Sequence, residues 1–154
     1  MADCRVPKFG SLLVLNPNHE LDVCIDMPTK PTVFNGIGKN DKPLTLIWPL
    51  ADVYICHRGE NPFEPAKQVD SFEKEITFTL QVPNLLLDYL RIKDRGFEDI
   101  FPIYYQDAVE EENKKWVEFN EQDYVMDNAD KMATITLSSW IKDPPIGWGG
   151  DNIE

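Results

Sequence analysis

The stretch from Ser71 to Lys93, SFEKEITFTLQVPNLLLDYLRIK, constrains the fold more than any other part of the sequence. In its first half every second residue is apolar, with Lys74 as the single charged exception. Such a period of two is typical of a β-strand with one buried face. Pro83 has no N–H to donate and ends the strand, while Asn84 is a suitable N-cap for the leucine-rich run after it. We therefore predict a strand followed by a short helix, with a structural rather than a chemical role.

Several other short apolar runs are separated by Pro, Asn and Gly, the residues that favour turns. Residues 11–15 and 21–25 are expected to pair as a hairpin across the turn between them. The run 44–56 contains Pro49, which argues against a single central strand and favours two short strands or one bent edge strand. A last clear strand is expected over residues 132–141.

The segment 100–119 has two interpretations. Strands at 100–105 and 115–119 could form a hairpin with 107–113 as its loop, which the aromatic residues favour. Alternatively, the i,i+4 pairs Glu110–Lys114 and Glu111–Lys115 could support one or two turns of helix.

These patterns predict a mainly β or α+β fold, an antiparallel β-sandwich or barrel-like sheet with one or two short helices. At 154 residues the chain is about one domain. We expect a single globular domain over 1–154, with a loosely held N-terminal arm (1–10) and C-terminal tail (143–154).

The charge of the chain is strongly negative and unevenly spread. Fifteen basic and 27 acidic residues give a net charge of −12. Residues 1–77 carry 8 basic and 11 acidic residues (net −3), and residues 78–154 carry 7 and 16 (net −9). Affinity for nucleic acid comes mainly from Lys and Arg on phosphates, so direct nucleic-acid binding is not expected. The excess of carboxylates suits a basic protein partner or serves solubility.

No apolar run approaches the ~20 residues of a membrane span, so no membrane partner is expected.

The three cysteines, Cys4, Cys24 and Cys56, are an odd number without regular spacing, which favours reduced thiols and makes the cytoplasm the default location. No ligand spacing for zinc is present, and a carboxylate turn at Asp123, Asp127 and Asp130 lacks the EF-hand pattern for calcium. We expect no metal and no other cofactor.

Catalytic signals are weak. No GxSxG motif occurs, and Cys56 and His57 are neighbours on a strand, so their side chains should point to opposite faces. His57 remains the one candidate general base, for a small hydrolase. No catalytic residue is assigned.

Aromatic residues and the acidic half supply the candidate binding residues. We expect Trp48 and Trp140 inside and Trp116 and Trp148 at a contact surface, because amphipathic aromatics are frequent interface hot spots. The expected binding set combines these exposed tryptophans with the acidic half: Glu110, Glu111, Glu112, Trp116, Glu118, Glu121, Asp123 and Trp148. The long irregular segment Asp26–Pro43 is a second place for a binding surface.

The sequence thus favours a non-catalytic protein–protein interaction or assembly protein, such as a viral or phage structural component within a virion or an adaptor, and it allows a homo-oligomer. The first alternative is an acidic inhibitor that mimics nucleic acid and blocks a DNA- or RNA-handling protein. The second alternative is the hydrolase using His57.

Overall fold

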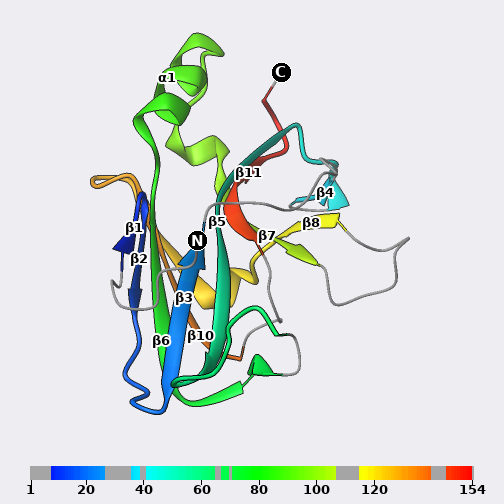
Figure 1. Ribbon diagram of the computed structural model, residues 1–154. Helices are drawn as coiled ribbons and strands as arrows, with labels where there is room; N and C mark the ends of the chain where they lie inside the picture. The colour runs from blue at the N-terminus through cyan, green and yellow to red at the C-terminus, as the bar shows by residue number, and fades with distance from the viewer. Residues whose placement is uncertain are drawn as a thin grey trace.

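Two β-sheets and one α-helix make up the protein in the computed structural model, which describes residues 8–26, 36–38, 41–64, 67–69, 71–106, 115–139 and 145–153. The two sheets lie face to face with the helix at one end (Figure 1). The five-stranded sheet has the order β1-β2-β6-β10-β9, and the six-stranded sheet has the order β3-β5-β11-β7-β8-β4. The predicted mainly β, sandwich-like fold is confirmed.

The five-stranded sheet is built around the predicted central strand. Its members are β1 (Lys8–Phe9), β2 (Leu12–Leu15), β6 (Ser71–Gln81), β9 (Tyr124–Asp127) and β10 (Met132–Ser139), all antiparallel to their neighbours. Alternation along β6 buries Ile76, Phe78 and Leu80 completely between the sheets. The sequence pattern therefore located both the strand and its buried face.

The six-stranded sheet contains one parallel pair, between its last two strands. Its members are β3 (Leu21–Asp26), β4 (Gly36–Ile37), β5 (Leu46–His57), β7 (Phe101–Gln106), β8 (Lys115–Glu118) and β11 (Pro145–Gly150). β7 and β8 form the expected antiparallel hairpin, and β4 runs parallel to β8. The loop of that hairpin, with its helical alternative, lies outside the described residues.

The helix α1 (Asn84–Ile92) follows β6 directly, as expected from the leucine-rich run. Its N-cap is Pro83 and no side chain caps it, so the assignment of Asn84 as N-cap is wrong. Leu86 and Leu90 are buried on one side of the helix, while Leu85 and Ile92 are exposed. The described residues also form two short 3₁₀ turns, η3 (Phe97–Asp99) and η5 (Glu121–Asp123).

One predicted pairing and one predicted strand assignment are wrong. β2 belongs to the five-stranded sheet and β3 to the six-stranded sheet, so the turn between them crosses from one sheet to the other instead of closing a hairpin. β5 is a single central strand in spite of Pro49. The strand accommodates this proline because the pairing with β11 shifts register there, and the β3 pairing covers only residues 52–57.

The C-terminal tail is also not loosely held over its described part. β11 lies between β5 and β7, and all six of its residues are buried. The Trp148 indole N–H donates to the carbonyl of Gln81 at 3.3 Å, which joins the two sheets. β11 is therefore part of the core.

Candidate functional site: an acidic groove beside β8

The strand β8 positions the candidate site near one edge of the six-stranded sheet. It pairs with β7 on one side, where Glu118 lies opposite Ile103, and with β4 on the other, where Trp116 lies opposite Gly36. Alternation along the strand puts Trp116 and Glu118 on one face and the two residues flanking Trp116 on the other. Trp116 is fully buried, whereas Glu118 is only partly buried.

After β8 the chain turns back toward the other sheet. The Phe119 N–H donates to the carbonyl of Pro102 at 3.1 Å, and the Asn120 side chain accepts a hydrogen bond from the Gln122 N–H at 3.1 Å. Asn120 thereby caps η5, which carries Glu121 along its first turn. This folding brings Glu121 next to β8.

Tyr124 ties this turn to the strand. Its hydroxyl donates a hydrogen bond to the carboxylate of Glu118, and so links β9 of one sheet to β8 of the other. Burial and the hydrogen bond to the Glu118 carboxylate raise the pKa of Tyr124 above its ordinary value. The hydroxyl stays protonated and keeps its role as donor, which holds the Glu118 carboxylate in place.

The opposite wall comes from β4 and the turn after it. The Gly38 N–H donates to the carbonyl of Lys42 at 2.8 Å, and the Leu44 N–H donates to the carbonyl of Gly36 at 2.9 Å. Asp41 lies in this turn with a φ of 59°, a left-handed conformation that Asp tolerates better than most residues. A Cβ at Gly36 would lie 2.4 Å from the Trp116 carbonyl oxygen, so only glycine lets β4 approach β8 this closely.

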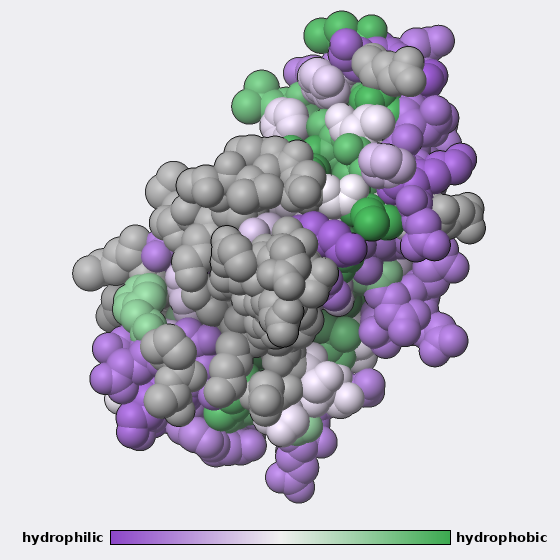
Figure 2. All heavy atoms as spheres, turned by 90° about the vertical axis from the view of Figure 1, so that its right-hand side faces the viewer, coloured by the Kyte–Doolittle hydropathy of each residue, from purple (hydrophilic) through white to green (hydrophobic). Residues whose placement is uncertain are grey.

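Between these walls lies a groove of about 590 Å³. Among the described residues, its lining combines three carboxylates, one ammonium, two side-chain amides and an apolar floor: Asp41, Glu118, Glu121, Lys115, Gln106, Asn120, Ile37, Gly38, Val117 and Phe119. The formal charge of this described part of the lining is therefore negative. Figure 2 views the molecule from the side on which β4 and β8 lie in Figure 1, and hydrophilic residues cover much of the described surface there.

The structure brings together two of the predicted binding residues, Glu118 and Glu121, in this groove. Asp123 lies in η5 but does not line the groove. Glu110, Glu111 and Glu112 lie outside the described residues, as do Trp140 and most of the segment between Asp26 and Pro43.

The expectation that Trp116 and Trp148 are exposed is wrong, because both are fully buried. Trp116 belongs to β8, which lies between β7 and β4, and its ring packs on Tyr105 with ring centroids 5.8 Å apart. The ring of Trp148 packs on Phe97 with centroids 6.0 Å apart. Trp48, which was expected inside, is half-buried. Trp116 and Trp148 therefore belong to the core rather than to a contact surface.

Sequence reasoning missed Asp41, Gln106, Lys115 and Asn120 as lining residues. Gln106 and Lys115 are direct partners across the β7–β8 hairpin, so the predicted hairpin could have placed them together. Asp41 had no such signal, because its position depends on the parallel pairing of β4 with β8.

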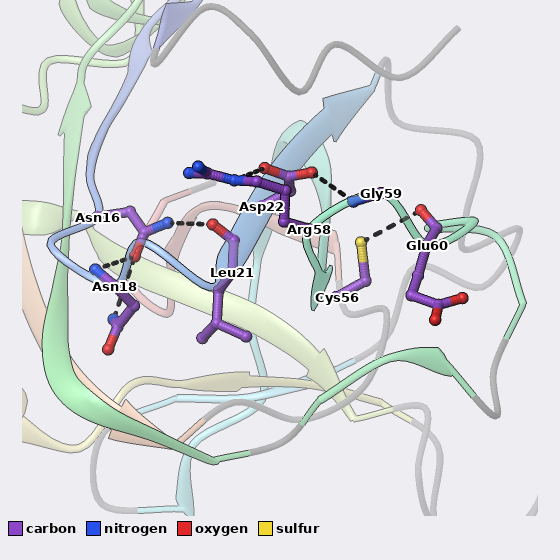
Figure 3. A network of polar contacts seen from close by, with 8 residues as sticks. All are labelled: Asn16, Asn18, Leu21, Asp22, Cys56, Arg58, Gly59 and Glu60. Carbon is purple, nitrogen blue, oxygen red and sulfur yellow. Dashed lines mark hydrogen bonds and ion pairs between the residues drawn. The ribbon is translucent and has the colours of Figure 1, made fainter.

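His57 is the last residue of β5, and the turn that follows it is held by structural contacts (Figure 3). Arg58 forms an ion pair with Asp22 at 3.6 Å, and the Gly59 N–H donates to the same carboxylate at 3.3 Å. The Cys56 thiol donates to the carbonyl of Glu60 at 3.7 Å, and burial, with smaller contributions from Asp22 and Glu60, raises its pKa. A thiol held protonated is a poor nucleophile, so this geometry does not favour catalysis by Cys56 with His57.

The expectation of reduced thiols is wrong for Cys24, which is disulfide-bonded, whereas Cys56 is free and buried. Cys4, the third cysteine, lies outside the described residues. Cys24 contacts Tyr54 and Cys56 in a small apolar cluster on the face of the six-stranded sheet that is turned away from the other sheet.

The carboxylate turn after β9 has a structural explanation. The Asp127 carboxylate accepts a hydrogen bond from the Asp130 N–H at 3.2 Å and so stabilises the turn between β9 and β10. Within the described ranges, no group of three or more His, Cys, Asp or Glu side chains is placed to hold a metal ion.

No helix in the part of the chain that the structure describes is long and apolar enough to cross a membrane.

Comparisons with known proteins find no matching family model, no matching curated protein and no matching solved structure.

Proposed function

We propose that this chain is a non-catalytic binding module and that the groove beside β8 takes a basic segment of a protein partner. The observation that carries the proposal is the convergence of Asp41 with Glu118 and Glu121 on one groove from two segments that are far apart in the sequence. A Lys or Arg side chain entering the groove would meet carboxylates at its rim and the apolar floor beneath its methylene stem.

The anchoring of Glu118 supports this role. Its carboxylate is already oriented by Tyr124, so less side-chain freedom is lost when a cation binds than for an unrestrained glutamate. Val117, which is partly exposed in the same groove, offers apolar contact to an extended peptide. Assembly through exposed tryptophans, the other route expected from sequence, has no support because Trp116 and Trp148 are buried.

Mimicry of nucleic acid stays an alternative for the same acidic surface. Such an inhibitor would insert into the basic groove of a folded DNA- or RNA-handling protein. The acidic groove beside β8 instead has room for one side chain or a short peptide.

The Cys24 disulfide favours an oxidising compartment over the cytoplasm, because structural disulfides are rare where thiols are kept reduced.

A direct test is fluorescence anisotropy with a labelled oligoarginine peptide as the probe, and an oligoglutamate peptide of equal length as its control. We expect the oligoarginine peptide to bind saturably and the oligoglutamate peptide not to bind. The affinity for oligoarginine should fall as NaCl is added. Equal binding of both peptides, or no binding of oligoarginine at low salt, would refute the proposal.

A further inference from the structure

The strand β9 forms one edge of the five-stranded sheet. It pairs with β10 along its whole length, and among the described residues no strand pairs with its other side. Every second residue of an edge strand directs its N–H and C=O groups away from the sheet, where they can bind another chain. β9 is therefore a template for one further strand.

The sequence of β9 does not block this edge. Edge strands are commonly protected by lysine, proline or a β-bulge. β9 reads YVMD, with neither lysine nor proline, and its four pairs with β10 run without a shift in register. Val125, in the middle of the strand, is 71% exposed. The edge is thus open to an extended chain.

The charge around β9 is negative. Residues 118–130, which hold β9 and the turns on both sides of it, include five acidic residues and no basic residue: Glu118, Glu121, Asp123, Asp127 and Asp130. The neighbouring strand β10 has no charged residue. Lys131 lies beyond the turn after β9, where its ammonium donates to the Asn128 side chain at 2.8 Å and lies over the ring of Phe97.

This charge determines which kind of chain the edge can accept. Two copies of the protein paired through β9 would bring their carboxylates together, and the repulsion disfavours such a dimer. A strand that carries Lys or Arg side chains instead complements the carboxylates.

The edge of β9 and the acidic groove meet at Tyr124. Tyr124 is the first residue of β9, and its hydroxyl donates to the Glu118 carboxylate in the groove. Tyr124 and Met126 are partly buried, whereas Val125 between them is exposed on the outward face. Side chains also alternate along an added strand, so every second one would lie on the side of Tyr124 and the groove. The described lining there also contains Lys115, but its three carboxylates outnumber this ammonium.

We propose that the basic segment taken by the groove binds as an extra strand on the outer edge of β9, with Lys or Arg at alternate positions. This inference rests on the proposed function and adds the way in which the partner is held. Main-chain hydrogen bonds to β9 supply affinity that does not depend on the partner's sequence, and the basic side chains at the groove supply the specificity.

N-methylated peptides test this arrangement by fluorescence anisotropy. The probe peptide alternates Arg and Thr and is about twice as long as β9; one analogue carries an N-methyl group on every Arg, and the other carries one on every Thr. In an added strand the N–H groups of only one of these two sets face β9. One analogue should therefore bind about 10- to 100-fold more weakly, through the loss of about two hydrogen bonds, and the other should bind like the unmethylated peptide.

The outcomes separate this inference from the proposed function. If the unmethylated peptide binds and the two analogues have equal Kd values, side chains alone hold the peptide and the added strand is refuted, while the groove remains a binding site. If the unmethylated peptide does not bind, the proposed function fails and this inference fails with it.

A charge placed at the edge tests the same arrangement on the protein. Val125→Lys puts an ammonium beside the added strand, so the Kd for the unmethylated peptide should rise about 2- to 5-fold. Leu13→Lys, an exposed aliphatic position on β2 near the opposite edge of the same sheet, is the matched control and should keep a Kd close to that of the parent. Circular dichroism verifies that both variants are folded. Equal changes in the two variants would mean that only the net charge matters and would contradict binding at β9.

Discussion

The side-chain amide of Asn18 forms two hydrogen bonds with the backbone of Lys74, a residue 56 positions later in the chain. Its Nδ2 donates to the Lys74 carbonyl at 2.8 Å and its Oδ1 accepts from the Lys74 N–H at 2.9 Å. Asn16 holds this turn in place, since its Oδ1 accepts from the Asn18 N–H at 2.9 Å and its Nδ2 donates to the Leu21 carbonyl at 2.9 Å (Figure 3). The buried amide thus fixes the crossing from one sheet to the other.

Replacing Asn18 with alanine removes both hydrogen bonds to Lys74. We expect Asn18→Ala to lower the free energy of unfolding by about 1–3 kcal/mol, because backbone groups at a part-buried position lose their partners. Urea unfolding measures the loss. Asn152→Ala, at an exposed position, is the matched control and should stay within about 0.5 kcal/mol of the parent. A similar small effect for Asn18→Ala would show that the amide is not structural.

Phe78 is fully buried at the centre of β6, between the sheets. Phe78→Ala should destabilise the protein by about 3–5 kcal/mol, or prevent folding, since truncation leaves a cavity in the core. Leu85→Ala, on the exposed side of α1, should change stability by no more than about 0.5 kcal/mol. Equal melting temperatures for the two variants would contradict the position of β6.

The hydrogen bond of Tyr124 to Glu118 makes a prediction about pH. Because folding raises the pKa of Tyr124, the folded state keeps a proton that the unfolded state loses above pH about 10. The stability contributed by this group is therefore present below that pH and is lost as the pH rises above it. Parent and Tyr124→Phe should be compared by urea unfolding between neutral and alkaline pH. We expect the advantage of the parent to shrink above pH about 10, and a constant difference would contradict the role of the hydroxyl.

The disulfide at Cys24 makes a prediction about thiol number. The sequence has three cysteines, a disulfide takes two, and Cys56 is free. Protein denatured without reductant should therefore take up one alkyl group from iodoacetamide, and all three cysteines should react after reduction. Mass spectrometry distinguishes the two states. Three alkyl groups without reduction would show that the native chain carries no disulfide.

The sequence predicted what depends on local pattern. Alternation located β6, the leucine run located α1, and the aromatic residues identified the β7–β8 hairpin. β11 was missed because Gly147, Gly149 and Gly150 have low strand propensity, and its burial comes from β5 and β7, which flank it. The effect of Pro49 on β5 was predicted wrongly. Proline is normally excluded from central strands, but this rule does not hold at a bulge such as the one in the β5–β11 pairing.

Only part of the groove was predictable from the sequence, because its walls depend on both local and long-range contacts. Glu118 and Glu121 are close in sequence and belong to an acidic stretch, so composition pointed to them. Asp41 joins them only because β4 pairs in parallel with β8, a long-range contact that leaves no local signature. Trp116 and Trp148 were wrongly predicted to be exposed. Tryptophan is amphipathic and equally suited to a core and to an interface, and only the tertiary fold decides which of the two environments it occupies.

The most direct measurement of the proposed function compares two double variants that remove the same charge from different faces. Glu118→Gln with Glu121→Gln neutralises two carboxylates of the groove and leaves an amide oxygen to accept from Tyr124, whereas Glu64→Gln with Glu73→Gln neutralises two exposed carboxylates elsewhere. Each partly exposed charge contact contributes about 0.2–1 kcal/mol, so the Kd for oligoarginine should rise about 2- to 30-fold in the groove variant. The account predicts this loss with a shallower salt dependence, and a parental Kd in the control variant. Equal losses in both variants would mean that only the net charge attracts the peptide and would contradict a binding site in the groove.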